Sequence, residues 1–387
     1  MIPRILQLPE DESLFLFGPR GVGKTTFIKS LPYFPQAIYI NLLKAQEENR
    51  FLRNPDELTA IVRGLRNTRQ HVIIDEIQKL PKLLDIIHDL IETVPTVKFI
   101  LTGSSARKLK HGGANLLAGR AFVYHLFPFT FTEISDSFQL DHALRWGMLP
   151  KLFEYDSDEK KQKFLEAYTN TYLREEIWAE QFIRELSPFQ YFLQVAAQSN
   201  GKMINFSSIA RDVGVSDTTV TKYYAILEDT LLGFFLYPFQ HSFRKRLSKA
   251  PKFFFFDPGI VRALLGLSSV PLSEHTSGFG DAFEHFVILQ CKQLAKYYRS
   301  EYRFSYLKTK DDAEIDLVVE RPGMNTLFIE IKSSKTVQPI HLKTLKSLAS
   351  DFGACEAVCF SRDPYPKKID TIRVLPWQQG ISEFFTK

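Results

Sequence analysis

The stretch GPRGVGKT, Gly18–Thr25, lies between the apolar run Ser13–Phe17 and a helical pattern that continues through Leu31. Its order of glycine, four residues and Gly-Lys-Thr is the phosphate-binding loop pattern. A loop between strand and helix offers backbone N–H groups and the positive end of the helix dipole to a polyphosphate. We therefore expect ATP here, with Lys24 on the β- and γ-phosphates and the Thr25 hydroxyl on Mg²⁺. The expected nucleotide-binding residues of this segment are Gly18, Pro19, Arg20, Gly21, Val22, Gly23, Lys24, Thr25 and Thr26.

Length and amino-acid composition limit the classes of protein to which this chain can belong. The chain has 387 residues, 44% of them hydrophobic and 24% charged, which is typical of globular proteins with two or three domains. No apolar stretch approaches the roughly 20 residues that a membrane-spanning helix needs, and no signal-peptide core is seen at the N-terminus. We expect no membrane partner and a cytoplasmic location. The three cysteines lack paired metal spacing, and the net charge of +5 permits contact with nucleic acid without requiring it.

A second motif, His71–Glu76, is a buried-strand pattern that ends in two carboxylates. This is the pattern of a Walker B strand, so Asp75 is expected to hold Mg²⁺ and Glu76 to polarise the attacking water. The alternative is an ordinary buried strand with an acidic end. The spacing of about 50 residues from the loop favours the catalytic interpretation. Hydrolysis of the triphosphate is therefore expected as well as binding.

Two further positions complete this half of the chain. Lys98–Ser105 is a strand pattern that ends in small polar residues, where AAA+ proteins place a sensor of the γ-phosphate. Thr102 and Ser104 are both candidates. Arg120 is a candidate arginine finger that acts on the nucleotide of a neighbouring subunit, which implies a homo-oligomer. The alternative for Arg120 is a surface salt bridge.

The middle of the chain has a helix-turn-helix pattern over Phe206–Tyr224. Ser207 is expected to cap the first helix, Gly214 to make the turn and Ser216 to cap the second. The basic run His241–Lys249 resembles a wing, so we expect a winged helix and favour contact with DNA. Asp217 and Glu228 on the second helix argue against phosphate contact there. The alternative is a winged helix that only packs or binds protein.

Four charged residues in the last third resemble the core of the PD-(D/E)XK nucleases. Glu284 lies on a helical run, Asp316 on a strand, and Glu330 and Lys332 two apart on the next strand, where they share a face. This resemblance implies a magnesium site made by Asp316, Glu330 and the Ile331 carbonyl. It also implies that Lys332 holds the attacking water and that Glu284 assists a second ion. The alternative is a sheet with solvated charges.

The motifs GPRGVGKT, VIIDEI, FILTGSS, LLAGR and FPFTFTE occur in this order along the chain. Together they resemble a group of bacterial and archaeal AAA+-like ATPases that carry a nuclease-like domain at the C-terminus. Gly147–Pro150 is similar to the lid motif of related ATPases, which implies that Pro150 packs near the adenine.

The predicted fold class is α/β. A P-loop AAA+-type parallel sheet over residues 1–135 is followed by a helical lid and connector over 136–185. A winged helix over 186–258 and an α/β restriction-endonuclease-like domain over 259–387 complete the chain.

The expected function is a Mg²⁺-dependent ATPase that acts on nucleic acid, with DNA favoured, through a metal-dependent nuclease site. The competing hypothesis is a nucleotide-gated regulatory or scaffold protein whose nuclease-like domain only binds, and a third is a transport or signalling ATPase with a protein partner.

Overall fold

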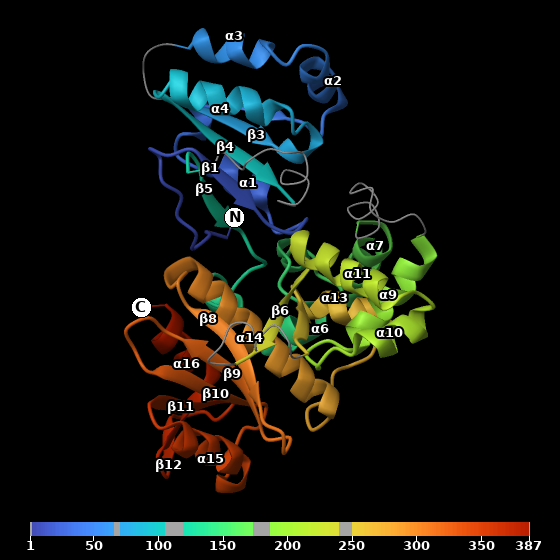
Figure 1. Cartoon of the computed structure of the whole chain (residues 1–387), viewed down its shortest axis with the longest axis vertical. Coiled ribbons are helices and arrows are strands. Elements are labelled where there is room, and N and C mark those ends of the chain that lie inside the picture. The colour runs from blue at the N-terminus through green and yellow to red at the C-terminus, as the bar shows by residue number, and fades with distance from the viewer. Residues whose placement is uncertain (1, 66–69, 105–118, 173–185, 240–249, 387) are drawn as a thin grey trace.

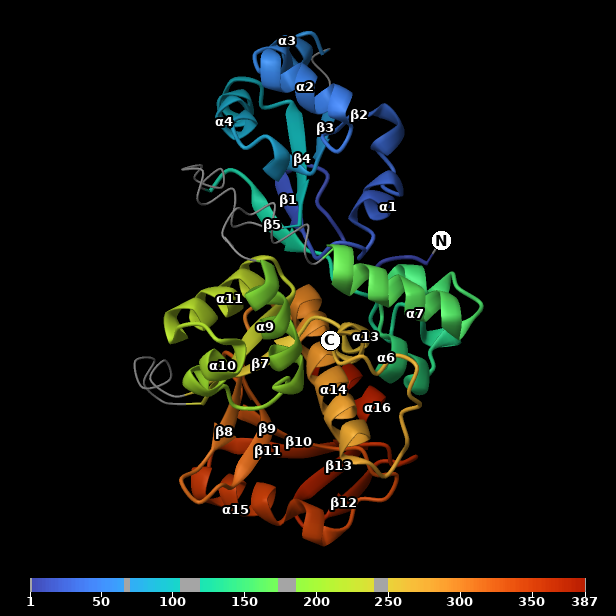
Figure 2. The ribbon, with the colours of Figure 1, turned by 90° about the vertical axis from the view of Figure 1, so that its right-hand side faces the viewer.

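The computed structural model describes residues 2–65, 70–104, 119–172, 186–239 and 250–386. The chain is elongated along its vertical axis in Figure 1, with the N-terminal sheet at the top and the C-terminal sheet at the bottom. A group of helices from the middle of the chain lies between these sheets (Figures 1 and 2). Within the described residues, no helix is both long and apolar enough to cross a membrane.

The N-terminal half is built on a sheet whose five described strands are all parallel. Their spatial order is β2-β3-β4-β1-β5. The strands are β1 (Leu14–Phe17), β2 (Ile38–Asn41), β3 (Gln70–Asp75), β4 (Val97–Gly103) and β5 (Phe122–His125). Because parallel strands run the same way, the loop after Phe17, the acidic end of β3 and the end of β4 all lie at one edge. This edge positions the nucleotide motifs.

Helices cover this sheet and connect its strands. They are α1 (Lys24–Lys29), α2 (Ala45–Arg53), α3 (Glu57–Arg63) and α4 (Leu83–Thr93). In α4 the apolar side chains recur at helical spacing, and Leu83, Leu84, Ile87 and Leu90 are all buried. They pack with Val72, Ile74 and Phe99 of the sheet in one apolar cluster. Strands and helices therefore alternate along the described residues of this half.

The middle of the chain is helical. Its elements are α6 (Leu140–Trp146), α7 (Asp158–Ala167), the short π-helical turn Tyr168–Tyr172, α9 (Leu186–Gln198), α10 (Phe206–Val213), α11 (Asp217–Asp229) and α13 (Pro258–Leu264). Asn205 caps α10 by accepting a hydrogen bond from the Ser208 N–H at 3.0 Å. The prediction that Ser207 caps this helix is wrong, because the capping residue lies two positions earlier and the Ser207 hydroxyl donates to Asp217. Gly214 ends α10 at φ 76°, and Ser216 caps α11, as expected.

A second sheet joins the middle of the chain to its end. Its described strands lie in the order β12-β13-β11-β10-β9-β8-β6-β7. They are β6 (Gly233–Pro238), β7 (Lys252–Phe255), β8 (Arg303–Lys308), β9 (Glu314–Glu320), β10 (Thr326–Lys332), β11 (Cys355–Ser361), β12 (Lys367–Ile369) and β13 (Ile372–Pro376). The antiparallel hairpin β6–β7 follows α11, and β6 also pairs with β8 in parallel. The hairpin therefore belongs to the helix-turn-helix region and to the C-terminal sheet at once.

Three helices pack on the C-terminal sheet: α14 (Ser277–Tyr298), α15 (Lys343–Phe352) and α16 (Trp377–Phe385). The apolar side of α14 meets β9, β10 and α6 in one buried cluster, to which Phe283, Phe286, Val287 and Leu294 contribute. Another cluster runs from Leu16 and Val22 of the nucleotide half through Tyr168 to Phe189 and Tyr224. The folded regions therefore share apolar cores across their junctions.

Candidate functional site

The phosphate loop begins directly after β1 and ends where α1 starts at Lys24. Gly21 and Gly23 have φ angles of 83° and 90°, a region that L side chains rarely adopt. A β-carbon on Gly18 would lie 2.3 Å from the Leu126 carbonyl oxygen. Glycine is therefore required at these three positions by backbone geometry and close packing.

Three side chains hold carbonyl groups of this loop. Arg4 donates to the Val22 carbonyl at 2.8 Å, and the Tyr168 hydroxyl donates to the Arg20 carbonyl at 2.8 Å. The ammonium of Lys24 donates to the Gly18 carbonyl at 2.7 Å and to the Pro19 carbonyl at 3.2 Å. Fixing the carbonyl groups limits the conformations of a loop whose glycines are otherwise free.

Asp75 is the centre of the acidic part of the site, and its side chain is fully buried. Its Oδ2 accepts hydrogen bonds from the Thr25 hydroxyl at 2.8 Å and from the Tyr39 hydroxyl at 2.7 Å. Its Oδ1 accepts from the Thr102 hydroxyl. Burial and the nearby Asp75 carboxylate raise the pKa of Tyr39, so its hydroxyl remains a donor. The fold thus brings Thr25, Asp75 and Thr102 together.

Glu76 follows Asp75 with a left-handed backbone at φ 63°, which is uncommon for a residue other than glycine. Its N–H donates to the Thr102 hydroxyl at 3.0 Å, and its carboxylate accepts from the Gln78 amide. That amide also donates to the Ser104 hydroxyl at 3.0 Å. Of the two sensor candidates, Thr102 contacts both acidic residues, whereas Ser104 is linked to Glu76 through the Gln78 amide.

The other predicted residues of this half lie at different distances from the loop. A β-carbon on Gly23 would be 3.8 Å from the Pro150 ring, so Pro150 borders the loop. Thr26 and Arg20 are exposed. Arg120 pairs with Glu92 of α4, with 2.7 Å from Nε to Oε1. It precedes β5, whose first residue is in register with Leu14, so it lies at the edge opposite to Asp75.

Helix α11 presents Asp217, Thr218, Thr221 and Lys222 to solvent. Glu228 is turned away from this surface, because its carboxylate accepts from the Phe235 N–H at 3.3 Å on β6. The expectation that Glu228 disfavours phosphate contact on the exposed face is therefore wrong. The basic run at 241–249, on which the wing prediction rests, lies outside the described residues.

The second cluster of charges forms where α14 and β7 meet β9 and β10. The register places Leu317 opposite Ile329, so Asp316 of β9 comes beside β10, and its carboxylate accepts from the Ile331 N–H at 2.7 Å. Lys332 pairs with Glu330 at 2.5 Å. The side chain of Glu330 is buried, and its Oε2 has no hydrogen-bond partner among the described residues. The four predicted residues come from the elements that the sequence indicated.

Two residues of this cluster were missed by sequence reasoning. Lys252 of β7 pairs with Glu314 of β9 at 2.5 Å and with Glu284 of α14 at 3.7 Å. Glu314 precedes Asp316 by two positions, and this alternation was a usable signal. No sequence pattern indicated Lys252, because its position beside these carboxylates depends on the pairing of β6 with β8.

Burial dominates the electrostatics of the cluster. It raises the pKa of Glu284 and of Glu330 to about 8, with the Asp316 carboxylate as the next cause in both. Burial also raises the pKa of Asp316. For Lys252, burial lowers the pKa, but the carboxylates of Glu284 and Glu314 outweigh it and keep the ammonium charged.

Within the described part of the chain, no group of three or more His, Cys, Asp or Glu side chains is arranged to hold a metal ion.

Comparison with family models divides the chain into three matches. Residues 10–135 match an AAA domain. Residues 137–270 match one domain of unknown function (DUF8612), and residues 279–379 match another (DUF4143). The N-terminal third is thus similar to AAA-type nucleotide-dependent ATPases, and its geometry is that of a P-loop site.

Curated relatives extend over most of the chain. An uncharacterized protein of Mycobacterium tuberculosis is 26% identical over 376 residues, covering 95% of this chain and 81% of that protein. An uncharacterized protein of Methanocaldococcus jannaschii is 24% identical, covering 91% of this chain and 82% of its own length. Among solved structures, the ORC2 protein of Aeropyrum pernix, in ADPNP–ADP complexes, covers 67% of this chain and 87% of its own. It is 14% identical, with a TM-score of 0.38.

Proposed function

We propose that the N-terminal half binds ATP and hydrolyses it with Mg²⁺, and that this reaction controls an action on DNA. The observation that carries the first part is the contact of the Thr25 hydroxyl with the Asp75 carboxylate at 2.8 Å beside the phosphate loop. The match of residues 10–135 to an AAA domain supports the same assignment.

The donor set suits magnesium, which prefers hard oxygen ligands and keeps several waters. Thr25 and Asp75 supply a hydroxyl and a carboxylate oxygen side by side. The bound ion would neutralise charge on the phosphates. Lys24 holds the β- and γ-phosphates, Glu76 orients the attacking water, and Thr102 keeps Asp75 and Glu76 in register.

The experiment measures ATP binding and phosphate release with and without Mg²⁺. We expect Lys24→Ala to abolish turnover, because the loop loses the cation that holds the phosphates. Lys44→Ala is the matched control, since Lys44 is an exposed lysine of the same half. Equal turnover in wild type and Lys24→Ala would exclude this site as the source of hydrolysis.

We further propose that the C-terminal cluster is a magnesium-dependent DNA nuclease site. The buried Oε2 of Glu330, which has no described hydrogen-bond partner, is an acceptor that an ion would satisfy. Asp316, Glu330 and the Ile331 carbonyl would hold that ion, with Glu284 nearby. The ion would stabilise charge on the phosphodiester, and Lys332 would hold the attacking water.

Cleavage of labelled single- and double-stranded DNA, with and without ATP and Mg²⁺, tests this site. Asp316→Ala and Lys332→Ala are expected to abolish cleavage while ATP turnover survives. If wild-type protein leaves every form of DNA substrate intact, the nuclease assignment is wrong.

The second candidate is a nucleotide-gated regulatory or scaffold protein whose C-terminal domain only binds. It is favoured by two ion pairs within the cluster, Lys332 with Glu330 and Lys252 with Glu314, which occupy carboxylate oxygens that an ion would need. Its signature is stimulation of ATP turnover by DNA or by a protein partner, with no effect of Asp316→Ala. Binding to DNA that does not weaken with salt excludes phosphate contact through α11, because phosphate contacts release counterions.

Assembly into a homo-oligomer belongs to the same proposal, with Arg120 acting on a neighbour's nucleotide. Mixing Lys24→Ala protein with Arg120→Ala protein tests it. A finger supplied from one subunit to another predicts that the mixture regains turnover, whereas no recovery excludes Arg120 as an arginine finger.

A further inference from the structure

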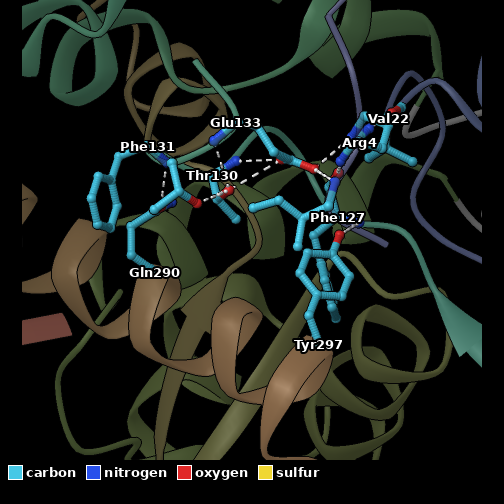
Figure 3. A network of polar contacts seen from close by, with 10 residues as sticks. Arg4, Val22, Phe127, Thr130, Phe131, Glu133, Gln290 and Tyr297 are labelled. Carbon is cyan, nitrogen blue, oxygen red and sulfur yellow. Dashed lines mark hydrogen bonds and ion pairs between the residues drawn. The ribbon is translucent and has the colours of Figure 1, made fainter. Parts of the chain in front are cut away.

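A buried polar network lies directly behind the phosphate loop and continues to α14 (Figure 3). Its centre is the ion pair of Arg4 with Glu133, at 2.9 Å from Nε to Oε1, with side chains only 6% and 0% exposed. Arg4 extends its other two nitrogens to the Val22 carbonyl at 2.8 Å and to the Phe127 carbonyl at 2.6 Å. One guanidinium therefore joins the phosphate loop to the segment after β5.

Both carboxylate oxygens of Glu133 accept hydrogen bonds. Oε1 accepts from the Ile5 N–H at 3.0 Å in addition to Arg4, and Oε2 accepts from the Thr130 N–H at 2.8 Å. A buried ion pair is tolerated when its remaining donors and acceptors are used, and it is costly to break by removing one partner. The network therefore has one strongly preferred geometry.

The same segment is fixed to α14 by two hydrogen bonds. The Phe127 N–H donates to the Tyr297 hydroxyl at 3.2 Å, and the Phe131 N–H donates to the Gln290 side-chain oxygen at 2.8 Å. In Figure 3 both side chains rise from this helix toward the loop segment. Helix α14 also carries Glu284, roughly 20 Å from Tyr297 along the axis at about 1.5 Å per residue. Helix α14 thus carries a residue of the C-terminal cluster and is bonded to the segment that Arg4 joins to the phosphate loop.

We propose that Arg4 is a positioning residue of the phosphate loop, and that its pair with Glu133 couples nucleotide binding to helix α14. This rests on the proposed function, because the loop must bind nucleotide. Val22 lies between two glycines with positive φ, and Arg4 fixes its carbonyl from behind. A nucleotide that requires the loop geometry seen here also favours the Arg4 network. By linkage, a change at α14 then alters nucleotide affinity by the same factor.

The first test titrates fluorescent mant-ADP with Mg²⁺, well below the melting temperature of each variant. We expect Arg4→Met to raise the Kd about five- to tenfold, which lies within the range for one lost hydrogen bond. Arg4→Lys keeps the charge without the planar fork, so its Kd is expected between those of wild type and Arg4→Met. In steady-state turnover of Arg4→Lys, KM is expected to rise more than kcat falls. A role confined to stability lowers the melting temperature and leaves the Kd of the folded protein unchanged, which would overturn the proposal.

Arg50→Met is the matched control, because Arg50 forms an exposed pair with Glu57 in the same half. Its Kd is expected to equal that of wild type. Wild-type protein that binds no mant-ADP refutes the proposed function itself. Wild-type binding with an unchanged Kd in Arg4→Met refutes only the role of Arg4.

The second test uses Tyr297→Phe, which removes the acceptor of the Phe127 N–H from α14 and lies outside the phosphate loop. We expect its Kd to rise about two- to fivefold. The double variant Tyr297→Phe with Arg4→Lys is expected to bind more tightly than the product of the single effects predicts, since both act through one network. A Kd unchanged by Tyr297→Phe, or effects that multiply fully, would show that α14 is not coupled to the loop.

Discussion

Thr102 is the side chain that links the two acidic residues of the nucleotide site. Its hydroxyl donates to Asp75 and accepts from the Glu76 N–H. A single hydroxyl in both roles fixes the end of β4 against the end of β3, where Glu76 has a left-handed backbone. Strain of this kind persists only where neighbouring contacts hold it.

We expect Thr102→Val, which keeps the shape and removes the hydroxyl, to lower kcat for ATP at least about tenfold. Ser104→Ala serves as the comparison, because the Ser104 hydroxyl accepts from the Gln78 amide and Thr102 is the hydroxyl that bonds Asp75. Its kcat is expected to stay within about threefold of wild type. Steady-state phosphate release measures both, and the reverse order of effects would make Ser104 the sensor.

The residues that sequence reasoning identified are those whose roles are encoded locally. The loop and the Asp75–Glu76 pair are contiguous motifs, and strand order only has to bring their ends to one edge. Arg4, Tyr39 and Tyr168 were not assigned to the site, because each reaches it from a distant segment with no motif of its own. Their contacts depend on tertiary packing that no local pattern reports.

At the scale of elements, the turn between α6 and the Pro150 segment depends on close packing. Gly147 has φ 88° and ψ −167°, a region open only to glycine. A β-carbon there would lie 1.9 Å from Oδ1 of Asp257, the residue that caps α13. Asp257 also accepts from the Met148 N–H at 2.7 Å. The Gly147–Pro150 segment and α13 are thus fixed to each other.

Gly147→Ala is therefore expected to cost about 2–4 kcal/mol, because backbone strain and overlap with Asp257 add. Gly266→Ala provides the control, since its φ is also positive but no atom would lie within 4 Å of the new β-carbon. Its expected cost is about 1 kcal/mol. Urea unfolding measures the loss of unfolding free energy in each variant. Equal losses in Gly147→Ala and Gly266→Ala would mean that the overlap with Asp257 is relieved.

Helix α14 also carries a buried histidine. Burial lowers the pKa of His285 to about 4, and Nε2 lies 2.7 Å from the Phe255 carbonyl. An unfolded histidine titrates near 6.5, so the stability that neutral His285 supplies is present above that pH and is lost as the pH falls toward 4. Burial acts in the same direction on His125 and His142.

We predict that unfolding free energy falls between pH 7 and pH 5, with about 2 kcal/mol of the loss due to His285. In His285→Gln the amide still donates to Phe255 but does not titrate, so this variant is expected to lose less over the same interval. Urea titrations at the two pH values measure the difference. An identical loss in both proteins would contradict the assignment.

At the scale of the whole molecule, the hairpin β6–β7 connects regions that sequence patterns treat as separate. The predicted boundary at residue 258 follows β7, yet β6 pairs with β8 of the C-terminal sheet. This pairing takes Lys252 to Glu284 and Glu314. Pairing between distant strands has no local signature, which is why the cluster was predicted without its second lysine.

Lys252→Met is expected to destabilise the protein more at pH 8.5 than at pH 6. The pKa of Glu284 is about 8, so at pH 6 this carboxyl is protonated and loses little when the ammonium is removed. At pH 8.5 the wild-type carboxylate is stabilised by the ammonium, whereas the variant must either bury an unpaired charge or take up a proton. Lys346→Met, which removes an exposed pair with Asp370, is the control. The drop in melting temperature of each variant relative to wild type is measured at both pH values. A drop for Lys252→Met that is the same at pH 6 and pH 8.5 would contradict the role of charge.

The central claim is that the site around Asp75 hydrolyses ATP. The most direct measurement compares wild type with Glu76→Gln for mant-ADP binding and for phosphate release in Mg²⁺. We expect Glu76→Gln to bind nucleotide within about threefold of the wild-type Kd, since the loop and Asp75 are intact, and to lose at least about a hundredfold in kcat. Turnover at the wild-type rate in this variant would contradict the claim.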